Sequence, residues 1–344
     1  MKRIAVGTEK GAYLLTGAGS NWEVEGPLFP GWKVTAFGNA PDGSHLAAVG
    51  SNWFGVGIHR SENLVDWSQT DNPPSWPEET GRRMEQIWAF HDDGARLWAG
   101  VAQAGLFTSD DGGFSWDPIE SLNEHRTRAD WHPGAGGLCA HRILSGAGSI
   151  WVGVSAVGVF RSDDGGVTWV PKNDGIPAVD TAEGAERPEV GYCVHGLAHD
   201  PADPFTMWRQ DHRGVFRSTD GGDNWERIEN GLPAGFGFVI WRSPASGRLL
   251  VVPLHSDENR VPVDGKLRAY ASDDGGDSWQ VAGDGWPDAA QFTGVLRGAF
   301  DGDEAGAFCF GTTGGKLWLT EDDGETWTEL DPAFPRIAAI ELVG

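Results

Sequence analysis

The sequence predicts an all-β fold, a seven-bladed β-propeller of four-stranded antiparallel blades. The first observation is an octamer that recurs five times: SDDGGFSW at 109–116, SDDGGVTW at 162–169, STDGGDNW at 218–225, SDDGGDSW at 272–279 and TEDDGETW at 320–327. The second is two shorter relatives, TGAGSNW ending at Trp22 and SENLVDW ending at Trp67. The third is the spacing of the seven closing tryptophans, which are 45, 49, 53, 56, 54 and 48 residues apart. This period suits four short strands and is too long for a two-helix repeat.

The segments around each octamer alternate apolar and polar residues, the pattern of strands with one face toward a core. One repeat therefore contains an inner strand at 137–144 (GLCAHRIL), a second strand at 149–155 (SIWVGVS) and a third at 158–162 (GVFRS). The octamer then forms a turn, and the outer strand follows at 168–172 (TWVPK). No stretch of the sequence keeps a helical period.

The two ends of the sequence predict how the ring closes. RIAVGTE at 3–9 matches the second strand of a repeat, so the first blade lacks its inner strand. RIAAIELV at 336–343 is a lone strand pattern. We expect this last strand to complete the first blade and close the ring, which removes exposed sheet edges. Residues 1–344 are then expected to form one propeller domain.

Composition excludes several classes of partner. The net charge is −24 and the pI about 4.6, whereas a nucleic-acid-binding protein needs a basic surface. An anionic membrane surface would also repel the chain, and no apolar run is long enough to cross a bilayer. Three cysteines match no disulfide framework, and the start of the sequence lacks the apolar region of a signal peptide. The expected location is therefore the cytoplasm.

The octamer is expected to be structural. Asp111 can accept hydrogen bonds from backbone N–H groups of its own turn, Gly113 permits a positive φ, and Trp116 can pack between strands. A calcium loop would need further oxygen ligands and a bidentate Glu, and none recurs after the octamers.

The pattern S-x-D-x-G-x-x-W resembles the Asp-box, or BNR, repeat. The chain resembles Asp-box propellers over nearly its whole length; these include sialidases, xyloglucan-cleaving glycosidases, sortilin-type receptors and photosystem-assembly factors. The resemblance implies the propeller fold and boxes that lie on the face away from an active site. It does not choose among these functions. A true sialidase is not expected, because that family pairs a tyrosine nucleophile with Glu and uses an arginine triad. Of Tyr13, Tyr192 and Tyr270, only Tyr192 starts an inner strand, and it has no evident Glu partner.

The face opposite the boxes is therefore where function is expected. Each box joins the third strand to the outer strand, so the turns between second and third strands lie on the other face. So do the connections that lead from one blade to the next. Three of these connections are long, at 68–83, 117–136 and 170–190, and long loops in compact folds are often functional.

Histidines on this face predict a divalent metal site. LCAHR and YCVHG place Cys139 with His141 and Cys193 with His195, each pair on one face of an inner strand. The turns RQDHRG and PLHSDENR add His212 and His255. The leading hypothesis is a soluble hydrolase in which His141, His195, His212 and His255 hold Zn, Mn or Fe, and the metal activates water. The competing interpretation is that each Cys and His pair only packs within its blade and recurs because the blades are repeats. The thiols would then be unreactive.

Further residues complete the candidate site. Asp211 and Glu85 are the candidate catalytic carboxylates, and Arg213 is expected to steady an anionic substrate. Arg142, Trp131 and Arg297 are the candidates for binding a small-molecule or carbohydrate substrate. A second hypothesis is a metal-free glycoside hydrolase that uses paired carboxylates of this face, including Asp257 and Glu258. A third is a non-catalytic propeller that binds a protein or assembly partner.

Overall fold

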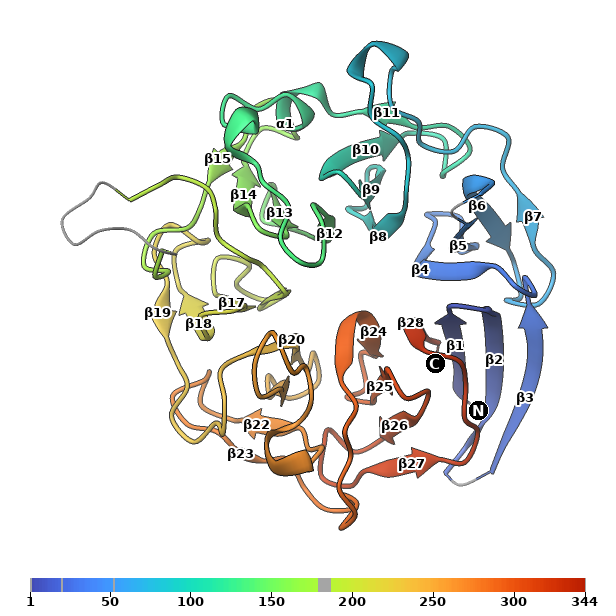
Figure 1. Cartoon of the computed structure of the whole chain (residues 1–344), viewed down its shortest axis with the longest axis vertical. Helices are drawn as coiled ribbons and strands as arrows, with labels where there is room; N and C mark the ends of the chain where they lie inside the picture. Colours follow the sequence, from blue (N-terminus) through green and yellow to red (C-terminus); the bar gives the residue numbers. More distant parts are fainter. Residues whose placement is uncertain (1, 20, 52, 179–186, 344) are drawn as a thin grey trace.

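The computed structural model describes residues 2–19, 21–51, 53–178 and 187–343. The chain forms a ring of seven four-stranded antiparallel sheets around a central channel (Figure 1). Each sheet is one blade, and the innermost strands of neighbouring blades contact each other around the channel. The predicted fold class is confirmed.

The strands of each blade are given from the channel outward. Blade 1 contains β28 (Ile337–Val343), β1 (Lys2–Thr8), β2 (Gly11–Ala18) and β3 (Asn21–Leu28). Blade 2 contains β4 (Lys33–Asn39), β5 (His45–Ser51), β6 (Gly55–Ser61) and β7 (Ser68–Gln69). Blade 3 contains β8 (Ile87–Asp92), β9 (Leu97–Val101), β10 (Gly105–Ser109) and β11 (Asp117–Pro118). Blade 4 contains β12 (Ala140–Gly146), β13 (Ser149–Val154), β14 (Gly158–Ser162) and β15 (Val170–Pro171).

The last three blades repeat this order. Blade 5 contains β16 (Gly196–His199), β17 (Met207–Gln210), β18 (Val215–Ser218) and β19 (Glu226–Arg227). Blade 6 contains β20 (Gly237–Arg242), β21 (Leu249–Pro253), β22 (Tyr270–Ser272) and β23 (Gln280–Val281). Blade 7 contains β24 (Val295–Gly302), β25 (Phe308–Thr312), β26 (Leu317–Thr320) and β27 (Thr328–Leu330).

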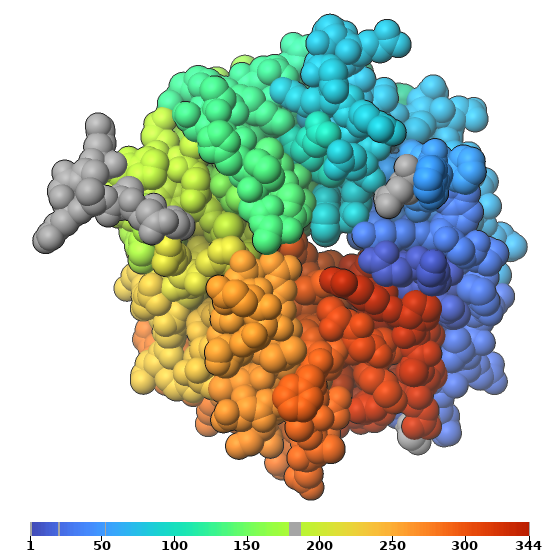
Figure 2. Space-filling view, viewed as in Figure 1, coloured from blue at the N-terminus to red at the C-terminus, as the bar shows by residue number. Residues whose placement is uncertain are grey.

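The ring closes through the C-terminal strand, as predicted. β28 pairs antiparallel with β1, so that Val6 lies opposite Ile340 and Arg3 opposite Val343. Figure 1 shows red β28 beside blue β1, with both chain ends at this blade. The space-filling view shows a narrow opening at the centre of the ring (Figure 2).

Each complete box is a hydrogen-bonded turn between the third and outer strands. In the first, Ser115 N donates to Asp111 Oδ1 at 2.9 Å and Ser115 Oγ to Asp111 Oδ2 at 2.6 Å. Gly113 N donates to Ser109 Oγ at 2.8 Å, and Gly113 has a φ of 91°. Equivalent bonds reach Asp164, Asp220, Asp274 and Asp322. The boxes are therefore folding elements, as expected from their sequence.

The box tryptophans also join neighbouring blades. Trp279 N donates to Asn230 O at 2.8 Å, and the equivalent bonds run from Trp225 N to Asp174 O and from Trp327 N to Asp284 O. The next residue, Gly231, has a φ of 99°, and a Cβ there would lie 2.1 Å from Trp279 O. The boxes therefore fix the spacing between blades as well as the turn within each blade.

The connections between blades hold the short helices α1 (Glu120–Asn123), η1 (Glu78–Thr80), η2 (Arg128–Asp130) and η3 (Val263–Gly265). Part of the third long connection, 179–186, lies outside the described residues. Among the described residues, no helix has the length and apolar character needed to cross a bilayer.

Candidate metal centre

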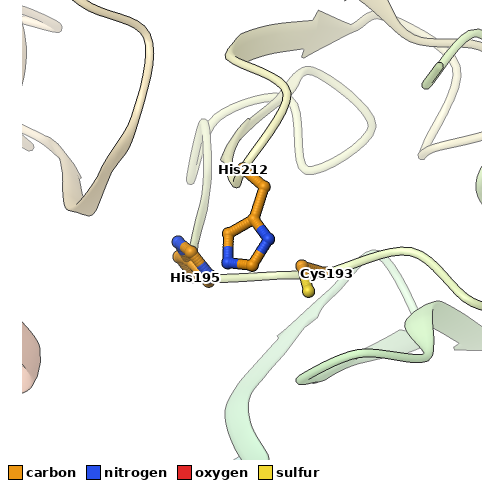
Figure 3. Close-up of side chains that lie close together, drawn as sticks. All are labelled: Cys193, His195 and His212. Atoms are coloured by element: carbon orange, nitrogen blue, oxygen red, sulfur yellow. The ribbon is translucent and has the colours of Figure 1, made fainter. Parts of the chain in front are cut away.

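Three side chains of blade 5 meet at the channel mouth opposite the boxes. Cys193 and His195 precede β16, and His212 lies on the turn between β17 and β18. One ligand atom from each lies within 4.8 Å of the other two. In Figure 3 the His212 ring points from its turn toward His195 and Cys193. Among the described residues, this is the one group of at least three His, Cys, Asp or Glu side chains close enough to share a metal ion.

His195 is prepared to act as a ligand. Its ring is fully buried and stacks on Phe238 with centroids 4.3 Å apart. Nδ1 lies 2.9 Å from Gly237 O and therefore carries the hydrogen, while the buried Nε2 has no hydrogen-bond partner. Burial, and then electrostatic repulsion from Arg297 and from His212 when it is protonated, hold the pKa of His195 well below its usual range. The ring is thus neutral with a free lone pair on Nε2, and a backbone carbonyl on the other nitrogen is the usual support of a metal-bound imidazole.

His212 and Cys193 complete the group from a more open position. The His212 and His195 rings meet edge to face with centroids 4.5 Å apart. Burial lowers the pKa of His212, although Asp257, whose Oδ1 lies 3.7 Å from Nε2, acts in the opposite direction. Burial and then Asp211 raise the pKa of the Cys193 thiol, while Arg209 and Arg297 act to lower it. A bound metal would have to displace the thiol proton, as it does at other cysteine ligands.

Asp211 lies beneath the turn that carries His212. Its carboxylate is 1% exposed, with Oδ2 3.0 Å from Arg209 Nε. Arg213 N donates to Asp211 Oδ1 at 2.5 Å, and Asp211 N donates to Gly214 O at 3.0 Å. Burial raises the pKa of Asp211 despite the charge of Arg209. These contacts fix the backbone of the turn and so fix the position of His212.

A cavity of about 500 Å³ adjoins the group at His212, whereas Cys193 and His195 do not line it. His212, Arg213, His255, Asp257 and Glu258 line it. Predicted residues from neighbouring turns therefore meet here, although His255 lies on the cavity wall and outside the three-residue group.

Two predicted arginines lie within the channel, on β24 and β12. Arg297 is buried, donates through Nη2 to Ser155 Oγ at 3.2 Å, and lies 5.0 Å from the Phe238 ring that also stacks on His195. Arg142 donates through Nη2 to Arg297 O at 2.5 Å. The two arginines are thus adjacent, and Arg297 lies beside the Cys–His group.

His141 does not join the group, because a β-bulge changes the alternation of its strand. Ala140 lies opposite Val154 and Arg142 opposite Gly153, so His141 is the extra residue of the bulge. Its Nε2 lies 2.8 Å from Val194 O, and its Nδ1 has no hydrogen-bond partner. Spacing along an ideal strand therefore gave the wrong neighbours for this ring.

Glu85 and Trp131 lie in other surroundings. Glu85 is exposed, accepts a hydrogen bond from Gln103 Nε2 at 2.9 Å, and lines a separate cavity of about 230 Å³. Trp131 is buried, and its Nε1 donates to Thr127 Oγ1 at 2.9 Å while Arg128 packs on its ring. The roles predicted for both side chains remain predictions.

Cys193 is the member of the group that the sequence analysis did not name as a candidate ligand. The signal was present in YCVHG, where the thiol lies two residues before His195. Cys193 is half-buried and faces His212, whereas Cys139 is buried and its thiol donates to Gly136 O at 3.3 Å.

Comparisons with known proteins support the fold. No family model matches the chain, and no curated protein matches its sequence. The YCF48 structure with a bound D1 peptide aligns with a TM-score of 0.55 and 14% identity over 90% of this chain and 92% of the other. YCF48 from Cyanidioschyzon merolae aligns with a TM-score of 0.55 and 12% identity over 91% of this chain and 95% of the other. A proposed 6-phosphogluconolactonase from Bacteroides uniformis aligns with a TM-score of 0.61 and 11% identity over 99% of each chain. At these identities the similarity concerns the propeller fold alone, which these proteins use for different purposes.

Proposed function

We propose that the chain is a metal-dependent hydrolase whose centre is formed by Cys193, His195 and His212. The observation that carries the proposal is the unpartnered, buried Nε2 of His195, which lies in a group whose ligand atoms are within 4.8 Å of one another. A buried polar atom without a partner is uncommon and calls for an explanation, and a metal ion supplies one.

The ligand types favour zinc over manganese or iron. One thiolate and two imidazoles form a set that zinc accepts, whereas manganese prefers oxygen ligands. Three protein ligands leave a fourth position for water, and zinc lowers the pKa of such a water to about 7. The chemistry supplied by the bound metal would be activation of that water.

The cavity beside His212 is lined by the residues proposed for the remaining roles. Asp257, whose Oδ1 is 3.7 Å from His212 Nε2 and accepts a hydrogen bond from Arg260 Nη2 at 2.5 Å, would take the proton of the attacking water. The water oxygen would bond to the electrophilic carbon or phosphorus of a small ester, and the leaving group would depart with a proton. Arg213 on the cavity wall would steady an anionic substrate. Asp211 would act through the His212 turn and not on the substrate.

Metal content tests the proposal directly. Purified protein dialysed against trace zinc should retain about one zinc per chain by elemental analysis. Cys193→Ser and His212→Ala should each weaken zinc binding by more than about 100-fold, since ligand loss exceeds the loss from supporting residues. The matched controls Cys139→Ser and His255→Ala should retain zinc, because both residues lie outside the group.

Activity is the second measurement. A panel of carboxylic and phosphoric esters should show hydrolysis that a chelator removes and added zinc restores. Absence of bound zinc in the wild-type protein, or equal zinc loss in Cys139→Ser and Cys193→Ser, would refute the metal centre. Tight zinc binding without hydrolysis would refute the catalytic role alone.

A further inference from the structure

A third cavity lies in the channel near the face that carries the boxes. It has a volume of about 340 Å³ and is called here the box-side chamber. Residues from five innermost strands, β4, β8, β12, β24 and β28, line it. Innermost strands run toward the box face, and Asp92, Asp301 and Glu341 lie near the ends of theirs. The chamber is therefore distinct from the metal centre at the opposite mouth.

Glu341 is a buried carboxylate without a hydrogen bond. Its side chain belongs to β28, the residue is 5% exposed, and neither Oε1 nor Oε2 has a hydrogen-bond partner. The nearest positively chargeable atom is His45 Nδ1, 3.5 Å from Oε1. Burying a carboxylate is unfavourable unless hydrogen bonds or a positive charge compensate it. Among the described residues, His45 is the one group within 4.0 Å that could compensate the Glu341 carboxylate, and it forms no hydrogen bond with it.

A second carboxylate lies beside it. Asp301 Oδ2 accepts a hydrogen bond at 2.8 Å from the backbone N–H of Leu342, the residue that follows Glu341. Burial, with a further contribution from the charge of Glu341, raises the pKa of Asp301 to about 7. The two acids therefore compete for stabilisation in the chamber.

The other titratable groups of the chamber balance this charge only in part, because Arg142 is the one that acts to lower the pKa of Asp301. Burial lowers the pKa of His91 to about 4 and that of His141 well below its usual range, so both rings are neutral near pH 7. Asp92 adds a third carboxylate. Arg142 is the cation of the lining, but its Nη2 is bonded to Arg297 O, and no carboxylate of the described residues lies within 4.0 Å of it. The chamber is negative inside a chain of net charge −24.

Aromatic rings form the rest of the wall. Trp88, Phe90 and Phe300 line the chamber, and the Arg142 guanidinium already lies 4.4 Å from the Phe300 ring centroid. Aromatic faces attract cations, most strongly where water is excluded. We propose that the box-side chamber binds a small organic ammonium ion, with its charge against Glu341 and Asp301 and its carbon atoms against Trp88, Phe90 and Phe300.

The same residues do not suit a bare metal ion. Calcium needs six to eight oxygen ligands, and magnesium needs near-octahedral coordination. Among the described residues, the Cys–His group at the far mouth is the one cluster with three metal-ligating side chains in reach of each other. An ammonium ion needs fewer acceptors and gains from the apolar walls.

Calorimetric titration tests the proposal with n-butylammonium chloride as the probe and 1-butanol as its neutral analogue. The wild-type protein should bind butylammonium in a saturable manner and bind butanol at least about tenfold more weakly. Glu341→Gln, which keeps the size of the side chain, should weaken butylammonium binding about tenfold or more. Glu304→Gln removes an exposed carboxylate near the end of β24 and should leave binding unchanged.

Further variants and a calcium titration complete the test. If Glu341→Gln unfolds, Asp301→Asn provides the charge test, and Phe300→Leu, which keeps both carboxylates, should also weaken binding. Equal binding of butylammonium and butanol, or no effect of the carboxylate variants, would overturn the proposal. Saturable binding of calcium chloride that is lost in Glu341→Gln would overturn it in favour of a metal site. Cys193→Ser should leave butylammonium binding unchanged, which separates this site from the metal centre.

Discussion

At the scale of single residues, burial decides what a polar side chain at the channel mouth does. Asp211 is 1% exposed and its Oδ2 lies 3.0 Å from Arg209 Nε. Removing one partner of a buried ion pair leaves the other charge uncompensated, which is much more costly than the pair is favourable. Asp211 therefore has a structural reason to be ionised, independent of any catalytic task.

Replacement of Asp211 tests this structural role. Asp211→Ala should lower the free energy of unfolding by about 3–5 kcal/mol, because Arg209 is left buried without its partner. Urea denaturation followed by tryptophan fluorescence measures the change. Glu258→Ala, an exposed acidic residue on the next blade's turn, is the control and should change stability little. Wild-type stability of Asp211→Ala with loss of activity would instead support the catalytic role predicted for this carboxylate.

The candidate site was only partly predictable from the sequence. His195 and His212 could be assigned to one mouth, because the boxes reveal which turns share a face. His141 was placed beside them by assuming regular alternation, and the bulge between Ala140 and Arg142 removes that regularity. Cys193 was missed because its half-buried position depends on how neighbouring blades pack. The chamber around Glu341 was missed altogether, since five blades far apart in sequence create it.

At the scale of elements, the box turn has two structural roles within one short segment. Hydrogen bonds to Asp111 and its equivalents hold the turn, and the box tryptophan backbone joins the preceding blade. Such local, repeated chemistry is readable from sequence, which is why the boxes gave the number of blades correctly.

A glycine at the blade junction shows how close this contact is. Gly231→Ala should destabilise the protein by more than about 1–2 kcal/mol, because φ is positive there and a Cβ would also lie 2.1 Å from Trp279 O. Gly43→Ala is the matched control: its φ of 84° is also positive, but a Cβ would meet nothing within 4 Å. Thermal unfolding of both variants measures the difference. Equal melting temperatures would show that the junction relaxes at little cost.

The box carboxylates should also make the free energy of unfolding depend on pH. Hydrogen bonds from the Thr168 hydroxyl and N–H, and then from Ser162, lower the pKa of Asp164 from 3.8 to about 2. A lowered carboxyl pKa contributes stability that is complete above the unfolded value of about 4 and is lost as pH falls toward about 2. The urea midpoints of wild type and Asp164→Asn should therefore differ at about pH 5 and converge near pH 2. Asp110→Asn, an exposed carboxylate of the preceding box, should show a smaller difference at the higher pH. A difference between the urea midpoints of wild type and Asp164→Asn that does not change with pH would exclude the titration of Asp164 as its cause.

At the scale of the whole molecule, one strand of seven residues closes the ring. β28 pairs with β1 and also contacts β24 and β4 of the flanking blades. The fold class was predictable in full because repeat length, strand alternation and the unpaired strands at the two ends all agree. The outer strands β7, β11, β15, β19 and β23 have only two residues each, so they are shorter than their sequence patterns indicated.

Removal of β28 should open the ring. A chain that ends at residue 336 exposes the edge of β1 and should melt at a lower temperature and aggregate, since unpaired edges recruit other strands. Size-exclusion chromatography and thermal melts measure both effects. A circular permutant that begins with 337–343 and joins them to Lys2 through a short glycine linker is the control. Val343 already lies opposite Arg3, so this permutant should behave like the wild type. A stable, monomeric truncated chain would show that closure by β28 is dispensable.

The position of Glu341 on β28 links the chamber to the assembly of the ring. β28 follows every other strand of the ring in the sequence, so the other walls of the chamber precede the Glu341 carboxylate along the chain. A molecule that binds between these walls and Glu341 stabilises only the closed form, because the open form lacks the complete site. Occupancy of the chamber would then shift the equilibrium between open and closed rings toward the closed form. The concentration of small amines in solution would set the size of that shift.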